Sequence, residues 1–205
     1  MGRRQVDSRE LRAELAHLSA RLLAEGGAAD FQSAKRKAAE QLGVGSPRAW
    51  PENLEVQQAL MEYQQLFEPE ALQLRLRRMR ECALVVMDRL VQFEPCLVGP
   101  ALYGTACEDT PVTLHIFSDE PEAVVRALID QRIPFDEDER RLRVAGSQSQ
   151  SFPMFSFAVD TQEVELVVFP SHQGRDRPLS PLDGKPMQRA DRAKVEALLN
   201  AADVA

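Results

Sequence analysis

The chain has 205 residues, of which 44% are hydrophobic and 28% are charged, and its formal net charge is −7. This composition is typical of a soluble globular protein with one good core or two small ones. The negative charge disfavours a general binder of nucleic acids or acidic membranes, and no apolar run is long enough to span a bilayer. We therefore expect neither a nucleic acid nor a membrane as a partner.

The first half of the chain predicts four helices. Asp7 is positioned to cap the first, whose leucines recur at helical spacing until Gly26. Asp30 is positioned to cap the second, which ends at Gly43. A third begins near Asn53, and its candidate core positions are Leu54, Leu60, Tyr63 and Phe67.

A fourth helix is predicted to follow a break at Pro69. Its apolar positions run from Leu72 to Phe93 at helical spacing. Its exposed side is expected to hold four arginines, Arg75, Arg77, Arg78 and Arg80, which would be solvated or would attract a phosphate.

The character of the chain changes at Pro95. Strands are predicted for 96–98 and 112–117, with a helix over 122–131 that Asp119 caps. The polar stretch 133–144 is interpreted as two edge strands around an acidic turn. The run 152–169 is interpreted as a hairpin with its turn at 160–162, and Asp191 is positioned to cap a last helix. We thus expect a helical domain over 1–93 and an α+β domain over 94–205.

In the stretch Leu97–Phe117, an apolar strand enters a turn at Gly99, passes through Gly104 and Thr105, and leaves on an alternating strand. This layout resembles that of a nucleotidyltransferase active-site loop. In such a loop the backbone N–H groups and a small hydroxyl side chain hold a triphosphate. Gly99, Gly104 and Thr105 are therefore the candidate phosphate-binding residues.

The carboxylates that two-metal chemistry needs are displaced or missing. Two acids at alternate positions of a strand converge on one face, but those positions are Pro111 and Thr113 here. A third carboxylate from a later strand has a candidate in Glu165. Glu108 and Asp109 precede the strand as substitutes, so the candidate Mg²⁺ ligands are Glu108, Asp109 and Glu165.

Three segments carry a resemblance to a known family: Gly104-Thr105-Ala106, the strand that ends at Phe169-Pro170, and the run 179–187, LSPLDGKPM. The region from Phe93 to Val195 resembles bacterial nucleotidyltransferase-domain proteins. The resemblance implies an α+β fold with a nucleotidyltransferase-like mixed sheet and flanking helices. Pro111 and Thr113 depart from the metal-binding pattern of that group, and Pro100 stands where its phosphate turn has a small hydroxyl.

Three functions remain open from the sequence. The leading hypothesis is a catalytically degenerate nucleotidyltransferase-fold protein that binds a nucleotide or another anion, or has a regulatory role, and needs no cofactor. The first alternative is an active enzyme that uses Mg²⁺ at Glu108, Asp109 and Glu165. The second is an interaction module that binds a protein partner through the helical half. Three cysteines without a paired motif favour a reducing cytoplasm, and the N-terminus shows no signal-peptide pattern.

Overall fold

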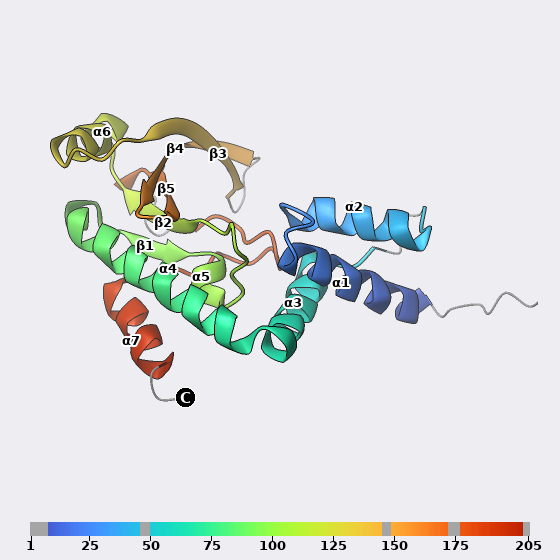
Figure 1. Cartoon of the computed structure of the whole chain (residues 1–205). Helices are drawn as coiled ribbons and strands as arrows, with labels where there is room; N and C mark the ends of the chain where they lie inside the picture. The colour runs from blue at the N-terminus through green and yellow to red at the C-terminus, as the bar shows by residue number, and fades with distance from the viewer. Residues whose placement is uncertain (1–7, 46–49, 145–148, 172–176, 203–205) are drawn as a thin grey trace, which may run out of the picture. The chain divides into compact units, whose positions relative to one another are not determined.

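The computed structural model describes residues 8–45, 50–144, 149–171 and 177–202 (Figure 1). The chain divides into two compact units, Met1–Leu72 with Pro181–Asp183, and Gln73–Ser180 with Gly184–Ala205. The domain boundary that the sequence suggests between 93 and 94 stays a prediction. Within the described ranges, no helix is both long and apolar enough to cross a membrane.

The first unit includes the helices α1 (Ser8–Ala24), α2 (Phe31–Leu42) and α3 (Asn53–Phe67). Helix α1 packs against both α2 and α3 (Figure 1). The buried side chains of Leu15, Ala38 and Ala39 form the centre of this core. The small alanines let α1 and α2 approach closely, and burial of the leucines supplies the main stabilising term.

Local signals set the ends of α2 as the sequence predicts. Asp30 Oδ1 accepts the Ser33 N–H at 2.7 Å, and the Ser33 hydroxyl accepts the Asp30 N–H at 3.2 Å, which completes a capping box. Gly43 ends the helix in the left-handed region at φ 68°. The Asp7 cap predicted for α1 lies outside the described residues.

The predicted core of α3 is partly wrong. Leu60 is buried and Tyr63 is half-buried, but Leu54 is 40% exposed and Phe67 is 64% exposed. The buried stripe instead follows Val56, Ala59 and Leu60, with two glutamines beside them. Because apolar residues occur all around this helix, spacing alone does not reveal which face packs.

Helix α4 (Pro69–Arg89) begins at the predicted break, and its apolar stripe is buried as expected. The placement of its arginines on an exposed side is wrong for two of them. Arg80 is buried, and its Nε donates to the Ala101 carbonyl at 3.1 Å. Arg75 is half-buried, and its Nη1 donates to the Ala106 carbonyl at 3.0 Å. These carbonyl acceptors are distant in sequence, so helical periodicity does not indicate them.

A five-stranded sheet forms the centre of the second unit, with strand order β1-β2-β5-β4-β3 (Figure 1). The bounds are Cys96–Val98 for β1, Val112–Phe117 for β2, Asp136–Arg143 for β3, Ser149–Val159 for β4 and Gln162–Phe169 for β5. Strands β2 and β5 are parallel and the other neighbours are antiparallel. The predicted α+β class, a helical part followed by a mixed sheet with flanking helices, is confirmed.

Three details of the second half differ from the prediction. The stretch 133–144 contributes one edge strand, β3, rather than two. Helix α6 (Pro121–Asp130) has Glu120 at its N-cap position, while Asp119 Oδ1 accepts the Ser171 N–H at 2.9 Å. A short helix, α5 (Pro100–Tyr103), interrupts the loop after β1 and was not expected.

The last helix agrees with the sequence signals. Helix α7 (Arg192–Ala202) follows Asp191, whose Oδ1 accepts the Lys194 N–H at 2.9 Å. The hairpin between β4 and β5 turns at Asp160 and Thr161, as predicted, with Asp160 at φ 53°. Aspartate tolerates this left-handed conformation better than most residues.

Arg80→Ala is expected to lower the free energy of unfolding by about 2 kcal/mol, because its buried guanidinium donates hydrogen bonds to main-chain carbonyls. Arg78→Ala, at an exposed position of the same helix, is the matched control and should change it by less than about 0.5 kcal/mol. Urea unfolding followed by circular dichroism measures both. Equal effects of the two substitutions would contradict a structural role for Arg80.

Candidate functional site

The parallel pairing of β2 and β5 collects the candidate polar residues on one face of the sheet. Thr113 lies opposite Glu165, His115 opposite Val167, and Phe117 opposite Phe169. Because side chains alternate along a strand, these six point to the same face. The other face is formed by buried aliphatic residues, Val112, Leu114, Ile116, Val164, Leu166 and Val168.

The candidate phosphate loop begins beside this polar row, since Val98 at the end of β1 lies opposite Thr113. Gly99 and Gly104 flank α5 at φ 73° and 86°, a region that strains any residue with a Cβ. The N–H groups of Leu102 and Tyr103 donate to the Gly99 carbonyl, and those of Gly104 and Thr105 donate to the Pro100 carbonyl. Four N–H groups of the loop therefore close its own turns.

Glu108, one of the two acidic residues of the loop, interacts with a group outside this polar row. Thr105 is buried, whereas Glu108 and Asp109 are exposed. Glu108 forms an ion pair with Arg75, at 2.5 Å between Oε1 and Nη2. Among the residues that the structure describes, no three histidine, cysteine or acidic side chains gather into a group that could hold a metal ion. The assignment of Mg²⁺ and the phosphate-binding role of the loop stay predictions.

Glu165 is engaged by two protein groups. Its Oε1 forms an ion pair with the Arg140 guanidinium, and its Oε2 accepts the Thr113 hydroxyl at 3.1 Å. The Arg140 side chain reaches from β3 across β4 and contacts the Met154 sulfur at 3.4 Å on the way. The Glu165 side chain is only 13% exposed, whereas that of Arg140 is 40% exposed, so the carboxylate side of this pair is the shielded one. A guanidinium thus supplies the positive charge at the carboxylate where a metal ion is predicted.

A second feature of the same unit is an open cavity of about 680 Å³, which we call the arginine pocket. It is formed by the end of α4, the entry to β1, the end of β2 and the segment before α7. Its charged lining residues are Arg177, Arg189 and Arg192 together with Glu94 and Asp191. Phe117 lines it as well, so the pocket opens toward the end of β2 away from Thr113.

Arg189 is held in place by three side chains of the sheet. Its guanidinium carbon lies 4.8 Å from the centre of the Phe117 ring and 5.0 Å from that of Phe169. Its Nε donates to His115 Nδ1 at 3.1 Å. Burial, with further contributions from Arg189 and Arg140, lowers the pKa of His115 to about 3. His115 is therefore a neutral acceptor of the Arg189 Nε–H.

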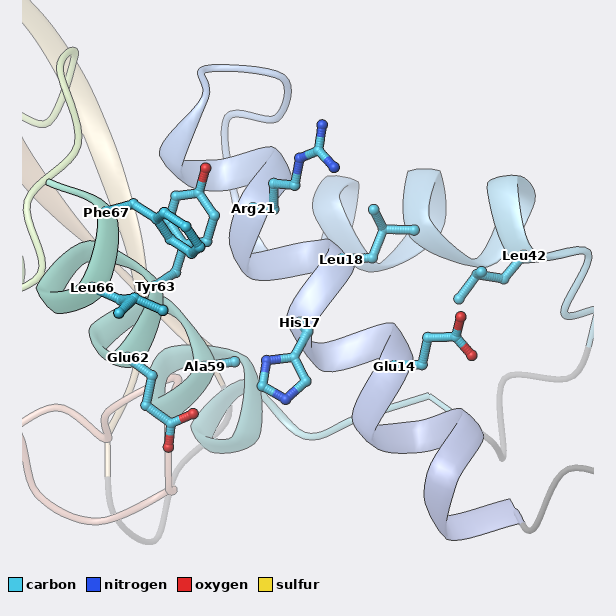
Figure 2. Close-up of a pocket in the computed structure, with 10 residues that line it drawn as sticks. All are labelled: Glu14, His17, Leu18, Arg21, Leu42, Ala59, Glu62, Tyr63, Leu66 and Phe67. Carbon is cyan, nitrogen blue, oxygen red and sulfur yellow. The ribbon is translucent and has the colours of Figure 1, made fainter.

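The helical unit carries a groove between α1 and α3, with a volume of about 500 Å³, which we call the helical groove (Figure 2). Figure 2 shows His17 of α1 beside Ala59 of α3, and the rings of Tyr63 and Phe67 beyond them. These two rings are 4.8 Å apart between centroids. Leu66 and Phe67 are 72% and 64% exposed, so apolar surface remains in contact with solvent at this end of α3.

Sequence reasoning missed the two arginines that dominate the sheet. Arg140 lies in a stretch dense in acids and arginines, and Arg189 stands alone before a helix, so neither belongs to a motif. For His115 the sequence did contain a signal. It alternates with apolar residues on β2, which predicts that its side chain lies on a packed face of the sheet. On α2, Lys35 is buried and donates to Asn53 Oδ1 at 2.8 Å.

A scan against models of known protein families finds no match, and a search of curated proteins finds no similar sequence. The resemblance to nucleotidyltransferase-domain proteins therefore rests on the sequence segments alone and stays a prediction.

The neutral His115 predicts a specific pH dependence of stability. Below the ordinary pKa of 6.5, the unfolded chain takes up a proton that the folded protein refuses until the pH approaches 3. The contribution of His115 to the free energy of unfolding is therefore fully present above pH 6.5. It is lost as the pH falls, by about 2 kcal/mol between pH 6.5 and 5. His115→Asn keeps an acceptor near Nδ1 but cannot titrate. Between pH 6.5 and 5, the free energy of unfolding of this variant should therefore fall by about 2 kcal/mol less than that of the wild type. Urea unfolding at each pH measures the difference, and parallel curves for the two proteins would contradict it.

Proposed function

We propose that this protein is a nucleotidyltransferase-fold protein that binds a nucleotide or a related anion without transferring a nucleotidyl group. The observation that carries the proposal is the pairing of Glu165 with Arg140 and Thr113. Two-metal transfer needs several ionised carboxylates directed at the same cations. Here the candidate metal ligand on the expected strand, Glu165, already has a guanidinium as its counter-ion.

The surroundings of Glu165 support the same interpretation. The two positions at which a nucleotidyltransferase would carry metal-binding acids are Pro111 and Thr113. The Thr113 hydroxyl donates to the Glu165 carboxylate and adds no negative charge. Glu108 is paired with Arg75, so this one of the two loop acids is also compensated by the protein. Removing Arg140 would leave a shielded carboxylate without its cation, which is costly. The pair therefore supports a fixed structural arrangement rather than an exchangeable metal site.

The anion-binding part of the proposal is supported by the second unit's cationic cavity and by the loop's resemblance to a phosphate loop. Proteins that bind phosphate groups use guanidinium groups for paired hydrogen bonds and charge. A ligand of this kind requires no metal ion when arginines neutralise its phosphates. Regulation by a bound nucleotide is the role that such a site would serve.

Calorimetric titration with each of the four nucleoside triphosphates, in EDTA and in Mg²⁺, tests this proposal. At least one should bind in EDTA with an affinity within about threefold of that in Mg²⁺, because arginines rather than a metal neutralise the phosphates. Binding that needs Mg²⁺ would favour the active alternative with Glu108, Asp109 and Glu165. Absence of binding to all four under both conditions would refute nucleotide binding.

A second candidate function is a protein-interaction role of the helical unit, which the exposed Leu66 and Phe67 beside the helical groove favour. The occupant that fits is an amphipathic helix of a partner protein, whose apolar side chains would enter the groove. Glu14 and Glu62 also line the groove, so basic residues should flank the apolar face of that helix.

A synthetic amphipathic peptide with a leucine face and lysine flanks is the probe for this second candidate. It should bind with contacts to α1 and α3, and Phe67→Asp should weaken the binding at least about tenfold because a charge replaces apolar contact area. Leu74→Asp is the control, since Leu74 is 50% exposed on α4 and does not line the groove. Fluorescence anisotropy of the labelled peptide measures both variants, and equal weakening by the two would argue against the groove.

A further inference from the structure

Strand β3 is the last strand of the sheet, so one of its edges pairs with β4 and the other faces away from the sheet (Figure 1). Its first four residues, 136–139, are exposed. Among the described residues, pairing of this outer edge with other backbone is confined to the far end of the strand, where the Arg143 carbonyl accepts the Leu179 N–H at 2.6 Å. An edge of this kind can accept a further strand through its main-chain groups.

Two contacts show which residues of β3 direct their backbone groups outward. In an antiparallel edge strand, alternate residues turn both N–H and C=O away from the sheet. Arg143 does so, because its carbonyl bonds to the segment after β5 and not to β4. The same alternation places Glu137, Glu139 and Arg141 outward, and the Glu139 N–H accordingly donates to the Asp138 carboxylate at 2.7 Å. An added strand would therefore form its hydrogen bonds at Glu137, Glu139 and Arg141.

The order of charges along β3 makes a second copy of the same strand a suitable partner. Its sequence, DEDERRLR, has four acids before three arginines, so an antiparallel copy presents arginines where the first presents acids. Registers in which outward-pointing residues face one another are allowed. The register centred on Glu139 sets Glu137 opposite Arg141 of the second copy, and Asp138 opposite its Arg140. Each contact occurs twice, because the two-fold axis exchanges the copies.

The neighbouring registers fit less well. Centring the pairing on Asp138 would set Glu137 opposite Glu139, and like charges directly opposite each other are destabilising. Centring it on Arg140 would bring Arg143 into the ladder, although its carbonyl already accepts a hydrogen bond. The register centred on Glu139 avoids both problems.

This register has two costs. Glu139 faces its own copy, which is one like-charge contact against four attractive ones, two for each of the pairs above. The Asp138 carboxylate must also release the Glu139 N–H, and it gains Arg140 of the second copy in exchange. Arg140 can meet it while paired with Glu165, because its side chain is 40% exposed. Charges on an edge strand normally deter pairing, but in this order they select a particular partner.

We propose that two copies of this chain associate through the outer edges of β3, antiparallel and centred on Glu139, so that their sheets become continuous. Backbone hydrogen bonds at Glu137, Glu139 and Arg141 hold the two strands together, and the charge pairs fix their register. This association is independent of nucleotide binding. An interface built on one short edge lies at the small end of the range for protein complexes, so the dimer should dissociate on dilution.

Sedimentation velocity of the full chain over about a hundredfold range of concentration tests the proposal. The wild type should shift from one chain to two chains per particle as the concentration rises. Arg141→Glu and Glu137→Arg should each raise the dissociation constant at least about tenfold, because each turns two attractive contacts into repulsive ones. Arg78→Glu makes the same charge change at an exposed position of α4, should leave the constant unchanged and is the matched control.

A mixture of the two strand variants tests the register itself. Arg141→Glu and Glu137→Arg, combined in equal amounts, should dimerise about as tightly as the wild type, because acids of one edge then face arginines of the other. Both positions are exposed, so circular dichroism should show unchanged folding. A wild type that stays monomeric at every concentration would overturn the proposal. So would a dimer that the strand substitutions weaken no more than Arg78→Glu does, or a mixture that fails to pair.

Discussion

The parallel pairing of β2 with β5 is the constraint on which the ion pair of Glu165 and the position of Arg189 depend. Its register sets Thr113 beside Glu165 at one end and Phe117 beside Phe169 at the other. A shift by one residue would turn all of these side chains to the opposite face and expose the aliphatic ones. The burial of Leu114 and Leu166 on that opposite face therefore fixes where the polar groups lie.

Arginine side chains take the role of fixed internal cations in this unit. Arg140 balances Glu165, while Arg75 and Arg80 hold the loop after β1 through carbonyl oxygens. Arg189 differs because the group that accepts its Nε–H is a neutral histidine. The first three stabilise the scaffold, and the fourth lines the arginine pocket with its orientation fixed by two aromatic rings and His115.

Local structure followed from local signals in the sequence. The Asp30 capping box and Gly43 act within a few residues of themselves, so the bounds of α2 were predictable. The exposure of Leu54 and Phe67 was not predictable, because apolar residues occur all around α3 and only packing selects the buried face.

The candidate site shows the same limit more strongly. Glu165 was predictable as a strand acid near the loop, since alternation and parallel pairing give its face. Its partner Arg140 lies two strands away in the sheet, and Arg189 approaches from a segment beyond β5. Pairings of this kind arise from tertiary structure, and one sequence contains no spacing that indicates them.

The central claim is that the Glu165 carboxylate is a structural ion-pair partner and supports no nucleotidyl transfer. Release of pyrophosphate from each nucleoside triphosphate, measured with Mg²⁺ and with Mn²⁺ in a coupled assay, tests it most directly. The account predicts release no faster than that of a buffer control, for the wild type and for Glu165→Gln alike. Metal-dependent release by the wild type that Glu165→Gln abolishes would contradict it and establish an active enzyme.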